Sequence, residues 1–441
     1  MEIAISLATF LALLIIGVPI FWSFFISAIA IMLLLNLSPD FIPSVGFYAV
    51  YHPTLLIILY FILAGELMSV GGMAERMTSF ANSLVGKIRG GLAAVGIVSS
   101  LFFAALTGSG IASVAGVGGV LIPRMEQYGY DRRYSTAVIC SSSFLGYLIP
   151  PSIPVIIYAF VAQQSIAALF LSTVIPGILL AISYLLVNHF TCRKWIHPVS
   201  DEGITPKTTR GSIIEVGRTG FRAFPALLTP VIILGGIYGG VFTPTEAGAV
   251  AVVYALIAGG LIYRQMKLKQ TSEIFVRTAI TFGMMLIMLV FGMGFTRILV
   301  QQGFAEQMAV TTLGFSRNPY VILAMLNVLL LFLGMFIDLI VIIIVIVPLL
   351  LPLLSGMDFN FIHIGAVLIV NVGIGVITPP FAISLFLGSR VGNVPYLQLV
   401  RPVLPFLFFA AIPVLIITTY IPHVSLWLPT LIIGEKIVGV W

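Results

Sequence analysis

Two tandem prolines interrupt long apolar stretches of this 441-residue chain. Pro150-Pro151 lies in SSSFLGYLIPPSIPVIIYAF, and Pro379-Pro380 lies in LIVNVGIGVITPPFAISLFLG. Proline lacks a backbone N–H and pushes the preceding residue out of the helical region, so each pair breaks a helix. Inside a membrane, the backbone groups freed by such a break need a partner. Two matched breaks therefore predict a paired binding site.

Polar side chains beside the breaks add oxygen ligands. Ser142 precedes the first break and Asn371 precedes the second. Ser152 begins the half-helix after the first break, where backbone N–H groups and the helix dipole favour a carboxylate or another anion. Thr378 lies just before the second break and could cap it. Each break thus offers oxygens to a small cation and amides to an anion, as expected of a cation-coupled anion carrier.

A short Gly- and hydroxyl-rich segment lies in the stretch FFAALTGSGIASVAGVGGVLIP. This stretch has no hydrophilic loop between two spans, so it predicts a re-entrant hairpin. Its tip would be Thr107, Gly108 and Ser109, which offer two hydroxyls and a backbone that an ion can approach closely. The alternative is that these small residues only allow close helix packing.

A single acidic residue interrupts the corresponding second stretch, LLFLGMFIDLIVIIIVIVPLLLP. Asp338 is the only charged residue between Arg317 and Asp358. A carboxylate in an apolar run is costly, and its presence indicates function. It could bind Na⁺, carry a proton, or cap the start of a half-helix. The sequence leaves these three roles open.

The two stretches repeat in one register. Pro150 and Pro379 are 229 residues apart (379 − 150), and no gap is needed from about Thr107 to Tyr158. Chance alignment is the alternative, but an internal repeat with interrupted helices is typical of secondary transporters. The same offset pairs Ser109 with Asp338, Pro123 with Pro352, Ser142 with Asn371, and Gly146 with Gly375. The predicted Na⁺ ligands are Thr107, Gly108, Ser109, Ser142, Gly146, Asp338, Asn371 and Gly375, and the predicted substrate contacts are Ser152, Thr378 and the four prolines of the breaks.

The composition indicates what must hold these residues. The chain is 60% hydrophobic and 8% charged, against roughly 25% charged residues in soluble domains. Apolar runs long enough to cross a bilayer recur along it, which predicts a polytopic helical membrane protein. The net charge is +6, and the Lys and Arg residues are concentrated in a few short polar loops. This distribution is typical of the cytoplasmic loops of membrane proteins and not of nucleic-acid binding. Cys140 and Cys192 have no metal-ligand spacing and are interpreted as packing residues.

The polar loops divide the chain into segments. Gly17-Val18-Pro19 is expected to split the first apolar block, and RGSIIEVGRTGFRAF is expected to lie along the inner surface. The predicted organisation is scaffold helices at 1–90, a first transport repeat at 91–192 (hairpin about 95–124, broken helix about 135–162), a cytoplasmic loop and interfacial helix at 193–222, scaffold helices at 223–318, a second transport repeat at 319–400 (hairpin about 322–354, broken helix about 361–392), and a C-terminal helix and tail at 401–441.

Three charged residues are additional, less specific candidates for the binding site. Glu66 lies in or near the membrane and could pair with another scaffold group. Glu246 follows the TPT turn, where it could simply cap a helix start. Arg297 ends an apolar run, from which its side chain could reach the interface.

Several motifs, in their order and spacing, resemble those of one transporter family. They are GELM, RGG, GSGIAS, IPRMEQYGYD, GYLIPPSIP, GGVFTPTEAGAVAVVYAL, GMFID and NVGIGVITPPF. Together they resemble the large membrane subunit (DctM/SiaM-like) of tripartite ATP-independent periplasmic (TRAP) transporters. The resemblance runs from about Ile16 to the SLWLP near the C-terminus.

The resemblance implies a mechanism and partners. The family imports organic acids across the bacterial inner membrane, usually with a Na⁺ gradient, and works as an elevator. A periplasmic binding protein delivers the acid, and a smaller membrane subunit of about four spans (DctQ/SiaQ-like) accompanies the large one in the lipid. The family's hairpin tips correspond to Gly108, Ser109 and Asp338. One departure is IASVAGVGG with Ser113, where many relatives carry a polar or acidic residue, so hairpin one would supply hydroxyls and carbonyls only.

The expected fold is an all-α polytopic membrane protein with an inverted repeat of two re-entrant helical hairpins and two broken helices. The expected function is Na⁺-coupled import of a carboxylate or sulfonate. The alternative is a self-sufficient carrier of the divalent-anion/Na⁺ symporter type, without a binding protein. Scattered His and Cys offer no catalytic set for an intramembrane enzyme, and two occluding hairpins argue against a channel.

Overall fold

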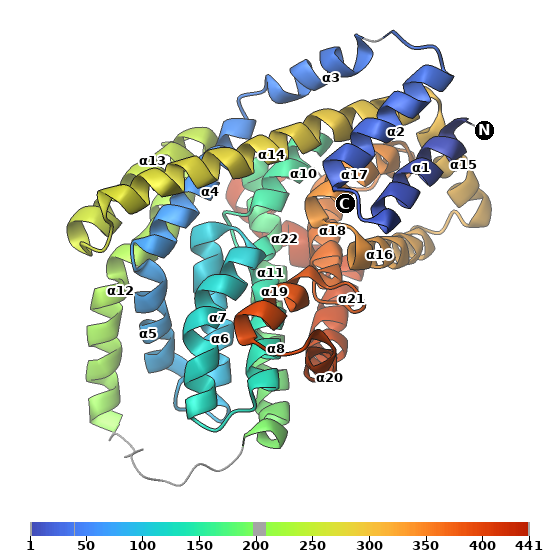
Figure 1. Cartoon of the computed structure of the whole chain (residues 1–441). Helices are drawn as coiled ribbons and strands as arrows, with labels where there is room; N and C mark the ends of the chain where they lie inside the picture. Colours follow the sequence, from blue (N-terminus) through green and yellow to red (C-terminus); the bar gives the residue numbers. More distant parts are fainter. Residues whose placement is uncertain (1, 39, 197–208, 440–441) are drawn as a thin grey trace.

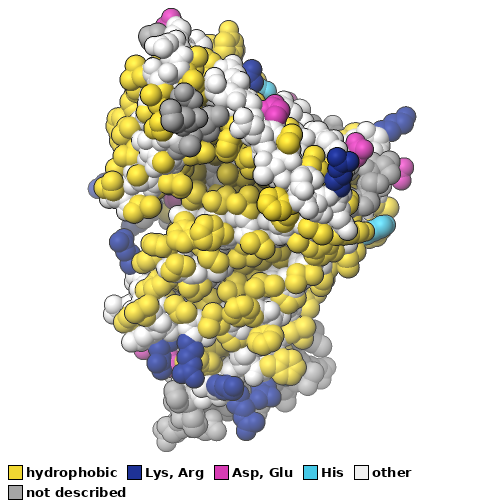
Figure 2. Space-filling view, turned by 90° about the vertical axis from the view of Figure 1, so that its right-hand side faces the viewer, with side chains coloured by type: hydrophobic (Ala, Val, Ile, Leu, Met, Phe, Trp, Pro, Cys, Tyr) yellow, Lys and Arg dark blue, Asp and Glu magenta, His cyan; other side chains and the backbone are white. Residues whose placement is uncertain are grey.

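The computed structural model describes residues 2–38, 40–196 and 209–439, and within them the regular elements are helices (Figure 1). Six helices are long and apolar enough to cross a membrane, or up to eight if each bent pair counts as one span. Figure 2 shows a broad hydrophobic band on one face, with Lys and Arg side chains gathered at its lower end. The expected polytopic all-helical architecture is therefore confirmed. Lys207 of the predicted cytoplasmic loop lies outside the described residues.

The helices in the segments predicted as scaffold form two sets. The first comprises α1 (Glu2–Ile16), α2 (Ile20–Leu34), α3 (Phe41–Val50), α4 (Leu55–Val70) and α5 (Met73–Val85). The second comprises α12 (Thr209–Tyr238), α13 (Pro244–Leu256), the π-helical turn η2 (Ile257–Ile262), α14 (Leu268–Gln301) and α15 (Phe304–Phe315). The predicted split of the first block is confirmed, because Gly17 has a positive φ of 89° and α2 starts after Pro19. Helix α14 is about 50 Å long and packs against α2, α3 and α4 (Figure 1).

The predicted surface helix, RGSIIEVGRTGFRAF, is not separate from the next span. Its residues form the first part of α12, which continues through Pro225 to Tyr238. A proline opens the helical hydrogen-bond ladder, and here a side chain fills the opening. The hydroxyl of Tyr263 accepts from the N–H of Ala226 at 3.2 Å and donates to the carbonyl of Arg222 at 3.1 Å. This bridge lets one helix replace the two that the sequence predicts.

The segments predicted as transport repeats form most of the other helices. The first repeat is α6 (Gly91–Thr107), α7 (Gly110–Gln127), α8 (Arg132–Ser143), α9 (Leu145–Leu148), α10 (Ile153–Ala162), α11 (Ile166–Thr191) and the short 3₁₀ turn η1 (Cys192–Trp195). The second is α16 (Pro319–Phe336), α17 (Leu339–Ser355), α18 (Phe361–Gly375), α19 (Ile383–Gly392), α20 (Tyr396–Phe406), the π-helical turn η3 (Leu407–Ala411) and α21 (Ile412–Tyr420). Helices α22 (His423–Ile433) and α23 (Glu435–Val438) follow. In Figure 1 the first repeat rises from α8 to α10, whereas the second descends from α18 to α20, as an inverted repeat requires.

The repeat register holds up to the second break and then shifts by one residue. Helix starts at Gly110 and Leu339, and at Arg132 and Phe361, keep the 229-residue offset. After the breaks, α10 starts at Ile153 and α19 at Ile383, which are 230 residues apart. The expected gapless alignment to Tyr158 is therefore wrong, because the second break is one residue longer.

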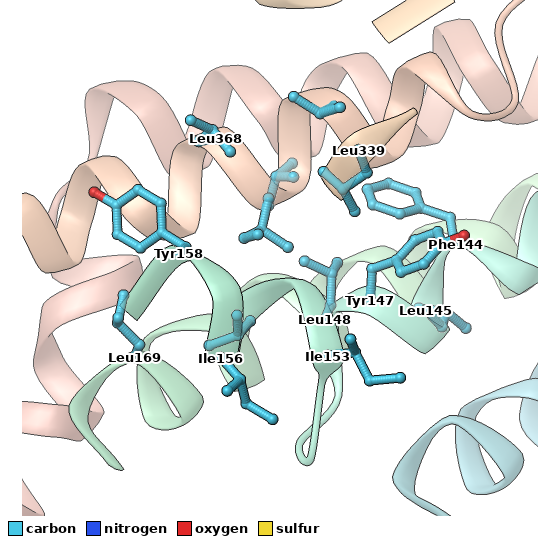
Figure 3. Close-up of a cluster of buried hydrophobic side chains, with 14 of the residues drawn as sticks. Phe144, Leu145, Tyr147, Leu148, Ile153, Ile156, Tyr158, Leu169, Leu339 and Leu368 are labelled. Carbon is cyan, nitrogen blue, oxygen red and sulfur yellow. The ribbon is translucent and has the colours of Figure 1, made fainter. Parts of the chain in front are cut away.

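The two broken helices pack against each other through glycines. A Cβ added at Gly373 would lie 2.0 Å from the ring of Phe144, and one added at Gly365 would lie 2.4 Å from the ring of Tyr158. The Tyr158 hydroxyl also donates to the carbonyl of Phe361 at 2.7 Å. Figure 3 shows Phe144, Tyr147 and Leu148 of the first break beside Leu339, the first residue of α17. The core thus brings the first break against the second hairpin.

Candidate functional site

Both predicted hairpin tips have the same local structure. Ser109 is extended and caps α7, since its Oγ accepts a hydrogen bond from the backbone N of Ala112 at 3.4 Å. Asp338 caps α17, since its Oδ1 accepts from the backbone N of Ile340 at 2.9 Å. The cap role that the sequence left open for Asp338 is therefore present. A carboxylate has two acceptor oxygens, so this cap contact leaves Asp338 able to bind a second group.

The two tips line one cavity of about 700 Å³. Scaffold helices α4 and α14 form its other wall. Asp338 and Ser109 are half-buried there, whereas Thr107 is buried. The polar lining residues are Glu66, Ser69, Thr107, Ser109, Tyr147, Arg277, Thr281 and Asp338. The structure thus brings Thr107, Gly108, Ser109 and Asp338 together from stretches that are far apart in the sequence.

The first tip lies directly on the first break. The backbone N of Ile153 donates to the carbonyl of Gly108 at 3.4 Å. A Cβ added at Gly108 would lie 2.3 Å from the carbonyl oxygen of Pro151, and one at Gly146 would lie 2.6 Å from the backbone N of Gly110. Only glycine fits at such contacts, and Gly108 also has a positive φ of 59°. Backbone oxygens of the first break and hydroxyls of the first tip therefore lie close together.

The second break packs against α16. The Cβ that Gly375 lacks would lie 2.6 Å from the carbonyl oxygen of Gly334. Nearby, the fully buried Asn371 uses its amide nitrogen to donate to the backbone oxygen of Asn327 at 2.9 Å and to its Oδ1 at 2.8 Å. A backbone carbonyl can only accept, so this contact fixes which end of the amide faces Asn327. Among the described residues, the buried Oδ1 of Asn371 has no hydrogen-bond partner.

Other predicted residues lie at the breaks but not in the cavity lining. The hydroxyls of Ser142, Ser152 and Thr378 donate to the carbonyls of Val138, Tyr147 and Ile374 at 2.6, 2.7 and 2.7 Å. Ser152 stands at the N-cap position of α10 without capping it. The expectation that Thr378 caps the second half-helix is wrong, because α19 starts later, after Ala382. These hydroxyls instead satisfy helix carbonyls close to the breaks.

The prolines also lie outside the cavity lining, which Ile153 and Pro154 reach instead. Pro150 and Pro151 are buried, whereas Pro380 is exposed and its carbonyl accepts from the Tyr396 hydroxyl at 2.7 Å. Both Pro-Pro peptide bonds are cis.

Of the additional candidates Glu66, Ser113, Glu246 and Arg297, only Glu66 lines the cavity. Glu66 lines the cavity and pairs with Arg277 at 3.6 Å. Ser113 is fully buried, and its Oγ has no hydrogen-bond partner within the described part of the chain. Glu246 forms a capping box with Thr243 at the start of α13, which accounts for it structurally. Arg297 is exposed near the end of α14 and does not line the cavity.

Five polar residues of this region were not predicted from the sequence. Four of them line the cavity, namely Ser69, Tyr147, Arg277 and Thr281, and the fifth, Asn327, holds Asn371. A lone amide in the apolar run of α16 was a usable signal for Asn327. Arg277 follows Arg264, Lys267 and Lys269 closely in the sequence and so resembles a loop charge, but it lies more than two turns inside α14. Tyr147 had no signal, because its role depends on where the second hairpin packs.

Comparisons with known proteins agree over nearly the whole chain. The family described as "Tripartite ATP-independent periplasmic transporter, DctM component" matches residues 7–424. The sialic acid TRAP transporter large permease protein SiaM of Vibrio cholerae is 37% identical, over 97% of this chain and 99% of that protein. The C4-dicarboxylate TRAP transporter large permease protein DctM of Pseudomonas aeruginosa is 37% identical, over 90% of this chain and 91% of that protein.

Two further comparisons are informative. The isethionate TRAP transporter permease protein DctMQ of Oleidesulfovibrio alaskensis is 34% identical, over 95% of this chain and 65% of that protein. Among solved structures, the YdaH transporter of Alcanivorax borkumensis superposes with a TM-score of 0.62 at 14% identity, over 89% of this chain and 88% of that one. At that identity the likeness concerns the fold alone.

Proposed function

The chain belongs to the DctM component family of tripartite ATP-independent periplasmic transporters, and from that premise we propose that it imports a small organic acid by Na⁺ symport. Its family is that of permeases of the bacterial inner membrane, which agrees with its apolar spans. The acid would be a carboxylate or a sulfonate, since relatives are named for sialic acid, C4-dicarboxylates and isethionate.

One observation carries the Na⁺ proposal: two repeat-related hairpin tips line one cavity, and each hairpin packs against a helix break, the first at Gly108 and Ile153 and the second at Gly334 and Gly375. In this proposal the first Na⁺ site uses Thr107, Ser109 and carbonyls around Gly108 and Gly146. Hydroxyl and carbonyl oxygens at interrupted helices suit Na⁺.

The second Na⁺ site would use Asp338 and the second break. The unpaired, buried Oδ1 of Asn371 supports it, because a buried carbonyl oxygen without a donor is costly unless a cation or water binds it. Carbonyls near Gly375 would complete the ligands. Movement of the two repeats against α4 and α14 would then carry the ions and the acid together, as an elevator.

The partners follow from the family. We propose that a small membrane subunit packs on the scaffold and that a periplasmic binding protein delivers the acid. One relative is named DctMQ, and this chain covers 65% of its length. The name and the uncovered part support a second membrane component, which here would be a separate subunit.

Reconstitution tests the proposal. The large subunit, its small subunit and its binding protein are placed in proteoliposomes, and uptake of labelled succinate, sialic acid and isethionate is measured with an inward Na⁺ gradient or with choline. Uptake of one acid that needs both Na⁺ and the binding protein is the expected result. Equal uptake without the binding protein would instead identify a self-sufficient carrier, and equal uptake in choline would exclude Na⁺ coupling.

A further inference from the structure

An ion pair crosses the scaffold wall of the cavity. Glu66 on α4 and Arg277 on α14 both line it, with 3.6 Å between their charged atoms. Asp338 lies on the opposite, hairpin side of the lining. Among the described residues that line this cavity, Arg277 is the single basic one against two carboxylates. An organic anion that enters therefore meets one fixed positive charge.

The ion pair is loose. A charge-assisted hydrogen bond between such groups spans about 2.7–2.9 Å, and the pair is longer than that. The side chains of Arg277 and Glu66 are 67% and 34% exposed, so the pair contributes little to stability. In the described part of the chain, no other polar contact of the guanidinium is found. Most of its five N–H donors are thus available to a ligand.

The pair lies toward one end of the wall that α4 and α14 form. Arg277, Thr281 and Met285 follow one another at four-residue spacing and present one face of α14 to the cavity. Glu66 lies in the last third of α4 and Arg277 in the first third of α14, toward the polar segment with Arg264, Lys267 and Lys269, whose positive charges are typical of a cytoplasmic loop. Ile62 and Met285 lie farther along these helices from that loop. The charged end of the scaffold wall is therefore its predicted cytoplasmic end.

We propose that Arg277 is the residue that binds the carboxylate or sulfonate group of the transported acid, and that Glu66 competes with the acid for it. A planar guanidinium binds such oxyanions through two parallel hydrogen bonds, which a lysine cannot reproduce. When the acid dissociates, Glu66 pairs with Arg277 again, and this pairing favours release of the acid. The inference rests on the proposed function, because it assigns a substrate contact in the same cavity.

The test compares variants of the complete transporter in proteoliposomes, with labelled succinate, sialic acid and isethionate as probes. Arg277→Gln is expected to raise the KM for the imported acid about 10- to 100-fold, as for loss of a hydrogen bond to a charged group. Arg277→Lys should lie between that variant and the wild type. Glu66→Gln should lower the KM, because the competing carboxylate is gone. Lys269→Gln, which removes a charge from the first turn of the same helix outside the cavity, should leave the KM unchanged.

The opposite changes in KM that are expected of Arg277→Gln and Glu66→Gln distinguish this role from a structural one. If the pair only tied α4 to α14, Glu66→Gln and Arg277→Gln would shift the KM in the same direction, and that result would overturn the inference. An unchanged KM in Arg277→Gln would do so as well. A wild type that takes up acid without Na⁺ would contradict the proposed coupling but not the Arg277 contact. Thermal stabilisation of the purified transporter by the same three acids measures that contact without transport, and equal stabilisation of wild type and Arg277→Gln would also reject it.

Discussion

The contact between the first hairpin tip and the first break can be tested by adding one methyl group. In Gly108→Ala the new Cβ would lie 2.3 Å from the carbonyl oxygen of Pro151 and 3.2 Å from the Cα of Ser152. Both neighbours belong to the backbone, so no side chain can turn aside. The residue would also have to keep a φ of 59°, which costs an L-residue about 1–2 kcal/mol.

The size of the effect follows from this geometry. Relief of the contact to an ordinary separation of about 3.5 Å requires the tip and the break to move apart by roughly 1 Å. A displacement of about 1 Å at a binding site can cost on the order of 100-fold in activity. We therefore expect the apparent Na⁺ affinity of uptake to fall at least about 10-fold. Gly146→Ala presses on the same tip at Gly110 and should have a similar effect.

The assay is a Na⁺ titration of acid uptake in proteoliposomes, with thermal unfolding of each purified variant. Gly119→Ala is the matched control: it lies in α7 of the same hairpin, and an added Cβ meets nothing within 4 Å. There the substitution should stabilise the helix by about 0.5–1 kcal/mol and leave the titration unchanged. A wild-type Na⁺ titration in Gly108→Ala would refute the idea that tip and break form one ion site.

Three further substitutions test individual ligands. Asp338→Asn keeps a good N-cap residue but removes the charge, so uptake and its Na⁺ dependence should fall about 10-fold or more with little change in unfolding temperature; uptake at the wild-type level would leave Asp338 only its cap role. Ser109→Ala should cost about 1 kcal/mol of helix stability and weaken apparent Na⁺ affinity, and an unchanged Na⁺ titration curve would remove Ser109 from the site. Asn371→Leu should destabilise the transporter by about 1–3 kcal/mol, because the acceptors of Asn327 lose their donor, and the double variant with Asn327→Leu should cost less than the sum of the single variants in thermal unfolding.

Sequence reasoning located the hairpins and breaks because their chemistry is local. Pro-Pro, Gly-rich tips and a lone Asp338 are anomalies in an apolar run, and the starts of α7 and α17 fall where the repeat predicts. The N-caps Asp131 and Asn360 also keep the 229-residue offset, which explains why α8 and α18 begin in register. Local signals of this kind do not depend on how distant segments pack.

What the sequence missed depends on contacts between distant segments. The single helix α12 requires the hydroxyl of Tyr263 to reach Arg222 and Ala226, which lie about 40 residues earlier in the chain. Asn327 matters only because α16 packs beside Asn371 on α18. The extra residue of the second break is equally invisible in a register defined by Pro-Pro. In each case a tertiary contact, and not a local preference, decides the outcome.

The charges of the cavity lining give a physical reason for coupling. Its ionisable groups of fixed charge are Glu66, Arg277 and Asp338, which sum to −1 when all are charged. An organic anion would enter against that charge, and Glu66 would compete with it for Arg277, the one cationic group of the lining. A Na⁺ bound at Asp338 would bring the sum to zero and leave Arg277 more favourable to a second oxyanion. The two tips therefore share the N-cap role but differ in charge: Ser109 is neutral, whereas Asp338 would make anion binding depend on a cation bound at the second tip. In this reading the paired proline breaks supply the oxygens, while Asp338 on the repeat-related cap makes the proposed symport obligatory.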